Sequence, residues 1–384
     1  MFERHAGGER VILVALDFGD PDFAESVAEL RLLASGAGLD VQGEVTGKRS
    51  RPDAALFVGS GKADEIAALV LATEADVVIF NHELSPAQER NLERRLHCRV
   101  IDRTSLILDI FARRAQSAEG KLQVELAQLQ HLSTRLVRGW THLERQRGGV
   151  GMRGPGEKQL ETDRRLLGVR VKALRERLAR LGKQRRTQRR SRSRQQVLSV
   201  ALVGYTNAGK STLFNALTHA GAYAADQLFA TLDTTTRKIY LPKVGEVVLS
   251  DTVGFITRLP HDLVAAFRAT LEATTEADLL LHVIDASSPA RERQIEAVDK
   301  VLREIGADAV PQLRVYNKLD LTGVAPGVAR DEYGKLHSVY VSAQTGAGLE
   351  LLREALSEIL LAGRAHLEVG APDEVSPQPS VFST

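Results

Sequence analysis

The chain has 384 residues, of which 43% are hydrophobic and 26% charged, and its formal net charge is +2. This length predicts two or three domains. The single cysteine, Cys98, excludes an intrachain disulfide framework and a cysteine-based zinc site. The polar start has no signal-peptide pattern, and no apolar run reaches the roughly 18 residues that a membrane span needs. We therefore expect a cytoplasmic monomer without a membrane span.

Residues 1–103 alternate short apolar runs with segments of helical periodicity. This pattern predicts a small α/β domain with a mainly parallel sheet. The expected strands are residues 11–16, 39–46, 55–58, 77–80 and 99–102, and the expected helices are residues 23–34, 63–72 and 86–96.

The turn Gly59-Ser60-Gly61-Lys62 invites comparison with a phosphate-binding loop. It departs from that motif because Leu56 stands where the first glycine belongs, and Ala63 cannot ligate magnesium. Our interpretation is a structural turn or a generic anion contact. A second nucleotide site is the alternative.

Residues 104–194 predict a long basic helical hairpin. Two leucine-rich stripes, with a glycine-rich tip at residues 148–156 between them, indicate two antiparallel amphipathic helices. The stripes are Leu122, Leu126, Leu129, Leu132 and Leu136, then Leu160, Leu167, Val171, Leu174, Leu178 and Leu181. Residues 135–194 hold 20 Lys/Arg and 5 Asp/Glu, a net charge of +15. Such a density favours RNA, with a solvated basic linker as the alternative. The candidate RNA contacts are Arg145, Arg147 and Arg153.

A phosphate-binding loop follows the expected strand at residues 197–203. Gly-x-x-x-x-Gly-Lys-Ser between a strand and a helix places backbone N–H groups around a phosphate. Lys210 would reach the β- and γ-phosphates, and Ser211 would ligate Mg2+. The nucleotide contacts expected here are Gly204, Tyr205, Thr206, Asn207, Ala208, Gly209, Lys210, Ser211 and Thr212.

Two further segments should respond to the γ-phosphate. The first is Phe229, Ala230, Thr231, Leu232 and Asp233. We choose Thr231 as the second Mg2+ ligand of the protein, although Thr234, Thr235 and Thr236 leave that choice open from spacing alone. The second segment is Asp251, Thr252, Val253 and Gly254, after an expected strand at residues 247–250. Asp251 would hold Mg2+ through water, and the Gly254 N–H would meet the γ-phosphate.

Asn317-Lys318-Leu319-Asp320 follows an expected strand at residues 312–316 and selects guanine. The Asp320 carboxylate would accept from guanine N1–H and the 2-amino group, which adenine lacks. Lys318 would pack over the ring. Ser342, Ala343 and Gln344 form a last loop, in which the Ala343 N–H would meet guanine O6. Further expected elements are a strand at residues 279–284 and helices at residues 289–305 and 349–361.

Residues 195–362 are thus expected to form a P-loop GTPase domain, with helices on both faces of a mostly parallel sheet. Residues 363–384, which contain several prolines and serines, are expected to be a short disordered tail.

These residues resemble the HflX family of ribosome-associated GTPases, which is related to Obg and Era. The resemblance covers nearly the whole chain and is carried by residues 57–62, 148–161, 229–233, 251–255 and 259–263. It implies GTP hydrolysis to GDP and phosphate with Mg2+, binding to the large ribosomal subunit and its rRNA, and splitting or rescue of stalled ribosomes. Thr234 departs from the proline usual in the family, and the C-terminal region is short.

The position after Gly254 is Phe255, where many GTPases have a glutamine that orients the attacking water. No catalytic side chain is therefore identified, and we expect slow basal hydrolysis that the ribosome stimulates. Asn207 resembles the asparagine of potassium-stimulated GTPases, with a purely structural role as the alternative. A competing hypothesis is an RNA-binding or RNA-remodelling protein whose N-terminal domain carries an ATP-dependent activity.

Overall fold

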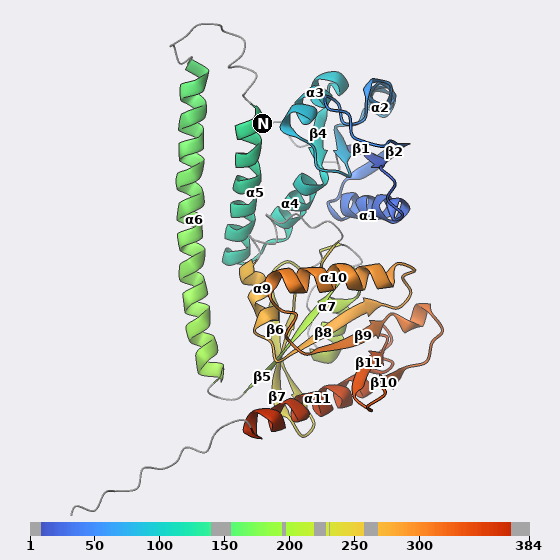
Figure 1. The fold of residues 1–384 in the computed structure, drawn as a ribbon, viewed down its shortest axis with the longest axis vertical. Coiled ribbons are helices and arrows are strands. Elements are labelled where there is room, and N and C mark those ends of the chain that lie inside the picture. The colour runs from blue at the N-terminus through green and yellow to red at the C-terminus, as the bar shows by residue number, and fades with distance from the viewer. Residues whose placement is uncertain are drawn as a thin grey trace, which may run out of the picture.

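The computed structural model describes residues 9–139, 155–193, 197–218, 228–229, 231–256 and 268–369. Figure 1 shows two α/β units with a pair of long helices beside them. None of the described helices combines the length and apolar character needed to cross a bilayer.

The first unit is built on a parallel four-stranded sheet of order β2-β1-β3-β4. Its strands are β1 (Arg10–Asp17), β2 (Asp40–Lys48), β3 (Val77–Phe80) and β4 (Arg99–Asp102). The inner strands β1 and β3 are almost entirely apolar because helices cover both faces of the sheet.

The expected strand at residues 55–58 is wrong. Asp53 Oδ1 accepts from the backbone N–H groups of Ala55 and Leu56, at 2.9 and 2.8 Å, and turns the chain there. Phe57 has a φ of 62° and is buried in the core. Its apolar character reflects this burial and not a place in the sheet.

Four helices accompany the first sheet: α1 (Phe23–Gly36), α2 (Ser60–Thr73), α3 (Pro86–Leu96) and α4 (Arg103–Arg114). Helix α4 was not predicted from the sequence. Its buried face packs into a core cluster that also contains residues of the second α/β unit. The first unit therefore shares part of its core with the second.

The two expected antiparallel helices are confirmed as α5 (Ala118–Gly139) and α6 (Pro155–Ser193). They pack through the leucine stripes, with Leu122, Leu126 and Leu174 buried and Leu129, Val171, Leu178 and Leu181 partly buried against them. Leu132 differs from the expectation, since 46% of it is exposed.

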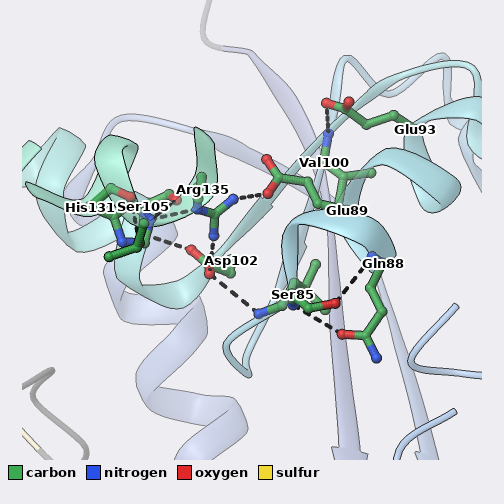
Figure 2. A network of polar contacts seen from close by, with 11 residues as sticks. Ser85, Gln88, Glu89, Glu93, Val100, Asp102, Ser105, His131 and Arg135 are labelled. Atoms are coloured by element: carbon green, nitrogen blue, oxygen red, sulfur yellow. Dashed lines mark hydrogen bonds and ion pairs between the residues drawn. The ribbon is translucent and has the colours of Figure 1, made fainter. Parts of the chain in front are cut away.

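Arg135 fixes helix α5 to the first unit (Figure 2). Its guanidinium donates to the carboxylate of Asp102, pairs with Glu89, and donates from Nε to His131 Nε2 at 2.9 Å. Asp102 is fully buried and also caps helix α4 by accepting from the Ser105 N–H at 2.8 Å. Burial lowers the pKa of Arg135, and its anionic partners offset the cost of burying it.

The second unit contains a seven-stranded sheet of order β10-β11-β9-β8-β5-β7-β6. Its strands are β5 (Leu198–Gly204), β6 (Thr235–Leu241), β7 (Gly245–Asp251), β8 (Leu279–Asp285), β9 (Gln312–Asn317), β10 (Gly327–Arg330) and β11 (Leu336–Tyr340). The five inner strands are parallel, and the edge strands β6 and β10 are antiparallel to their neighbours. Strand β10 was not expected from the sequence.

Helices cover both faces of the second sheet. Helices α7 (Lys210–Thr218) and α11 (Leu349–Val369) pack on one face with Val200 and Leu202 of β5. Helices α9 (Arg268–Thr275) and α10 (Arg291–Ile305) pack on the other, with Ala201 and Val203. Successive residues of β5 thus face opposite cores, as a strand buried on both faces requires.

The expected tail is wrong at its beginning, because α11 continues to Val369. Residues 364–369 contain alanine, leucine and glutamate, which favour a helix, and Gly363 does not end it. The rest of the expected tail, residues 370–384, lies outside the described residues.

Candidate nucleotide-binding site

The phosphate-binding loop connects β5 to α7 at the carboxyl edge of the sheet, where parallel α/β folds bind their ligands. Gly209 has a φ of 90°, and a Cβ there would lie 2.2 Å from Asn317 Nδ2. Only glycine allows this conformation and approach without strain. The N-terminus of α7 and the loop N–H groups form a setting suited to an anion.

Lys210 is held inside this loop. Its Nζ donates to the carbonyl oxygens of Gly204 and Tyr205 at 3.1 and 2.8 Å, and 6% of the residue is exposed. Burial lowers the pKa of Lys210 to about 8, and the charge of Asp251 opposes this change. A phosphate in the loop would supply the charge partner that the buried lysine needs.

Ser211, Thr231 and Asp251 bring three oxygen groups together. Ser211 Oγ lies 2.7 Å from both Thr231 Oγ1 and Asp251 Oδ2, and Thr231 Oγ1 lies 2.9 Å from Asp251 Oδ2. Asp251 is 1% exposed, and burial raises its pKa, while bonds from Ser211 and the charge of Lys210 lower it. Its Oδ1 is buried without a hydrogen-bond partner among the described residues.

This set fits Mg2+, which prefers hard oxygen ligands together with substrate phosphates and water. No group of three His, Cys, Asp or Glu side chains that could hold a metal occurs in the described part of the chain. A metal here would therefore depend on the two hydroxyls, one carboxylate and the nucleotide. P-loop nucleotide-binding proteins hold Mg2+ with the hydroxyl of the loop Ser or Thr, an Asp and the nucleotide phosphates.

The side chain of Phe255 is buried in a hydrophobic core. It is 1% exposed in the core shared by the two units. Its backbone pairs with the loop, because its N–H donates to Gly204 O at 3.1 Å and its carbonyl accepts from the Thr206 N–H at 2.7 Å. The preceding Gly254 approaches the loop so closely that a Cβ would lie 2.9 Å from Lys210 Nζ.

The Asn-Lys-x-Asp motif, expected to select guanine, begins at the end of β9. Asn317 Nδ2 donates to Ala208 O at 3.0 Å and thereby links this loop to the phosphate loop. Asp320 accepts from the Ser342 hydroxyl. The Ala343 N–H, expected to meet guanine O6, donates instead to Asn317 Oδ1 at 2.9 Å. A bond to O6 would require this N–H to be shared.

Asp285 is a residue of this site that the sequence interpretation missed. Its Oδ2 lies 2.7 Å from Lys318 Nζ, and its Oδ1 accepts from the Ser287 N–H at 2.9 Å. It therefore orients the lysine that is expected to pack over the base. An acidic residue at the end of β8, next to β9 in the sheet, was the available signal.

In the first unit, residues 59–62 at the start of α2 form a weaker candidate for an anion-binding site. An open pocket of about 610 Å³ is lined by Lys48, Arg49, Asp53 and residues 58–62, among others. Lys62 Nζ donates to Thr46 O at 3.1 Å and pairs with Glu65 at 2.7 Å. Its partners are thus a strand carbonyl and a helix carboxylate.

Several expected site residues lie outside the described residues. They are Ala230, the tip arginines Arg145, Arg147 and Arg153, and the motif at residues 259–263. Thr212 and Gln344 are described, half-buried on α7 and exposed on the last loop, respectively.

A glycine-rich phosphate loop, a metal-type oxygen cluster and an Asn-Lys-x-Asp loop on this sheet define a P-loop GTPase. Three family models match: "GTP-binding GTPase N-terminal" at residues 24–112, "GTP-binding GTPase Middle Region" at 114–192, and "50S ribosome-binding GTPase" at 199–318. The GTPase HflX of Escherichia coli (strain K12) is 59% identical over 94% of this chain and 85% of its own. The GTPase HflX of Caldanaerobacter subterraneus is 50% identical over 92% of this chain and 81% of its own. The chain belongs to the HflX family of GTPases.

A solved structure agrees with this assignment. The crystal structure of SsGBP in complex with GDP matches with a TM-score of 0.52 and 25% identity, and the match covers 92% of this chain and 99% of that one. The likeness therefore extends over both α/β units and the helical pair.

Proposed function

We propose that this GTPase binds the large ribosomal subunit through its helical hairpin and uses GTP hydrolysis to split or rescue stalled ribosomes. The observation that carries the proposal is the row of exposed basic side chains on α6: Arg164, Arg165, Arg170, Lys172, Arg175, Arg177, Arg180 and Lys183. The family model described as "50S ribosome-binding GTPase" supports the same partner.

Charge segregation supports an RNA target. Residues 135–194 carry +15 in a chain whose total is +2, so the remainder carries −13. Arg170 on α6 pairs with Glu125 on α5, at 2.5 Å. A segment with this excess of positive charge gains affinity for phosphate backbones by releasing their counterions.

The site geometry supports the following roles in nucleotide binding. Residues 204–212 would hold the phosphates, Ser211 and Thr231 would ligate Mg2+, and Asp251 would hold it through water. Asn317 would lie beside the guanine, Lys318 would pack over its ring, and the Asp320 carboxylate would accept hydrogen bonds from its N1–H and 2-amino group. Asn207, with a φ of 60°, is the candidate K+ ligand.

The burial of Phe255 supports a slow basal rate of GTP hydrolysis. A buried phenyl ring cannot hydrogen-bond an attacking water, so this position contributes no group that orients it. The ribosome is the partner that would supply or position the missing group. We expect large subunits to raise the rate of GTP hydrolysis.

Guanine recognition is tested by Asp320→Asn. The amide NH2 of asparagine would face the 2-amino group of guanine, and these two donors cannot form a hydrogen bond. The same NH2 could donate to the 2-oxo group of xanthine. GTP affinity should fall roughly 10- to 100-fold, the scale of a lost charge-assisted hydrogen bond, while xanthosine triphosphate should bind more tightly. Unchanged GTP affinity would show that Asp320 does not read the base. Asp331→Asn, in a turn of the β10–β11 hairpin, is the matched control.

Ribosome binding is tested by co-sedimentation with separated subunits in GTP, GDP and a non-hydrolysable analogue. Replacing Arg175, Arg177 and Arg180 with glutamine should weaken binding to large subunits and reduce the salt slope by up to about 3. The control replaces Arg237, Lys238 and Lys243, which are exposed on and beside β6. Equal effects of the two triple variants would contradict the proposed hairpin contact.

A further inference from the structure

The segment around Thr231 is seated on the first α/β unit. Phe229 is 2% exposed, and its ring lies edge-on to Phe111 of α4, with centroids 4.7 Å apart and planes at 82°. Leu228 and Leu232 are each 3% exposed in the same core cluster. The chain on both sides of Thr231 is therefore anchored by contacts outside the GTPase sheet.

Asp233 extends this anchorage to the start of helix α5. Its Oδ2 accepts from the N–H groups of Gln116 and Ser117 at 2.7 and 2.8 Å, and its Oδ1 accepts from the Ser117 hydroxyl at 2.5 Å. Ser117 Oγ in turn accepts from the Gly120 N–H at 2.8 Å, as a helix N-cap does. A carboxylate at this end of a helix is favoured by the helix dipole.

Gly120 leaves space for this contact. A Cβ at Gly120 would lie 2.1 Å from Asp233 Oδ1. Alanine is well tolerated inside helices, so it should keep α5 intact while displacing the carboxylate. The chain thus offers a variant that breaks the contact without changing either hydrogen-bonding side chain.

The seated carboxylate is two residues from the candidate metal ligand. Thr231 Oγ1 lies 2.7 Å from Ser211 Oγ and 2.9 Å from Asp251 Oδ2. Two residues of extended chain reach at most about 7 Å. Thr231 therefore stays within about 7 Å of Asp233 while Asp233 is bound to the start of α5.

We propose that Asp233 is a positioning residue that clasps the Thr231 segment to the N-terminus of α5, so that the metal-ligating arrangement and the seated hairpin helix stabilise each other. The proposal rests on the assignment of Thr231 as a Mg2+ ligand. Because coupling between two binding equilibria is reciprocal, a nucleotide that orders Thr231 strengthens the clasp, and loss of the clasp weakens binding of that nucleotide. The state of the nucleotide then biases how the basic hairpin sits on the GTPase domain.

The clasp is tested on the full chain with Mg2+, GDP and a fluorescently labelled, non-hydrolysable GTP analogue as probes. Asp233→Ala and Gly120→Ala should each weaken binding of the GTP analogue by about tenfold, within the usual range of coupling between sites, and change GDP affinity less than about twofold. Ser117→Ala keeps the two backbone donors and should have a smaller effect. Asp331→Ala removes a carboxylate that also accepts from two backbone N–H groups in a turn, and it is the matched control.

Amide hydrogen exchange over residues 116–120 provides a second readout, since three of these N–H groups belong to the clasp or its cap. The GTP analogue should slow their exchange relative to GDP in the natural chain, and this difference should vanish in Asp233→Ala. Thr231→Ala tests the assignment of Thr231 as a Mg2+ ligand separately from the contact made by Asp233. If Thr231→Ala leaves affinity for the analogue unchanged, the metal-ligand assignment fails. If it weakens binding while Asp233→Ala and Gly120→Ala do not, or if exchange is the same in both nucleotide states, the clasp is overturned.

Discussion

Two Gly-Lys pairs in this chain lie where a helix begins, one in each α/β unit, and they differ in what surrounds the lysine. Lys62 keeps 27% of its side chain exposed and bonds to Thr46 O and Glu65. Lys210 is 6% exposed inside its own loop, close to the carboxylate of Asp251. We therefore expect Lys210, which is enclosed by its loop and close to a carboxylate, to bind phosphate, and Lys62 not to.

The largest contrast should appear when each lysine is replaced with alanine. Lys210→Ala should lower the rate of GTP hydrolysis by about 100-fold or more, the scale of losing a main electrostatic contact to the reacting phosphate. Lys62→Ala should leave that rate within about twofold. Rates of both GTP and ATP hydrolysis are the measurement. Residual ATP hydrolysis in Lys210→Ala that disappears in the double variant would support the competing hypothesis of an ATP-dependent first unit.

The next largest contrast should appear when the glycine before each lysine, Gly209 or Gly61, is replaced with alanine. Gly209→Ala should weaken GTP binding roughly 10- to 100-fold, because its φ of 90° and the 2.2 Å approach to Asn317 Nδ2 exclude a Cβ. At Gly61 a Cβ would meet nothing within 4 Å. Gly61→Ala in α2 should instead raise the free energy of unfolding by up to about 1 kcal/mol. Nucleotide titration and denaturant unfolding of both variants provide the test, and similar losses of GTP binding would contradict the contrast.

The smallest expected effect is a pH dependence that belongs to the enclosed lysine. Bound phosphate favours charged Lys210, whose pKa without phosphate is about 8. Below pH 8 the lysine is already charged, so affinity should be flat. Above pH 8 binding requires uptake of a proton, and affinity should fall by up to about tenfold per pH unit. Guanosine, which has the same base but no phosphate, is the control ligand, and an equal slope for guanosine would rule out Lys210 as the cause.

The sequence predicted the GTPase unit more fully than the first unit. Its inner strands are continuous apolar runs, and the residues at their carboxyl ends carry an ordered set of motifs, which together leave few other folds. The first unit carried weaker signals. Residues 55–58 are apolar because Phe57 enters the core from a turn, so composition suggested a strand that hydrogen bonding does not form.

The sequence also could not decide which threonine hydroxyl joins Ser211 as a candidate Mg2+ ligand. Four threonines, Thr231 and residues 234–236, were available at similar spacing. The structure brings Thr231 within 2.9 Å of Asp251, while Thr235 and Thr236 lie in strand β6. Which hydroxyl reaches the cluster depends on how the segment is anchored, and spacing along the chain does not contain that information.

By itself, the sequence determined the class of fold, the phosphate loop, the guanine motif and the basic character of the hairpin. These are local features, since each depends on residue types within a few positions of one another. Only the tertiary structure decided where Phe255 points, that Asp285 holds Lys318, and that Asp233 meets the start of α5. Those contacts join residues 33 to 117 positions apart or bury a side chain between two units, so they arise from packing and not from local pattern.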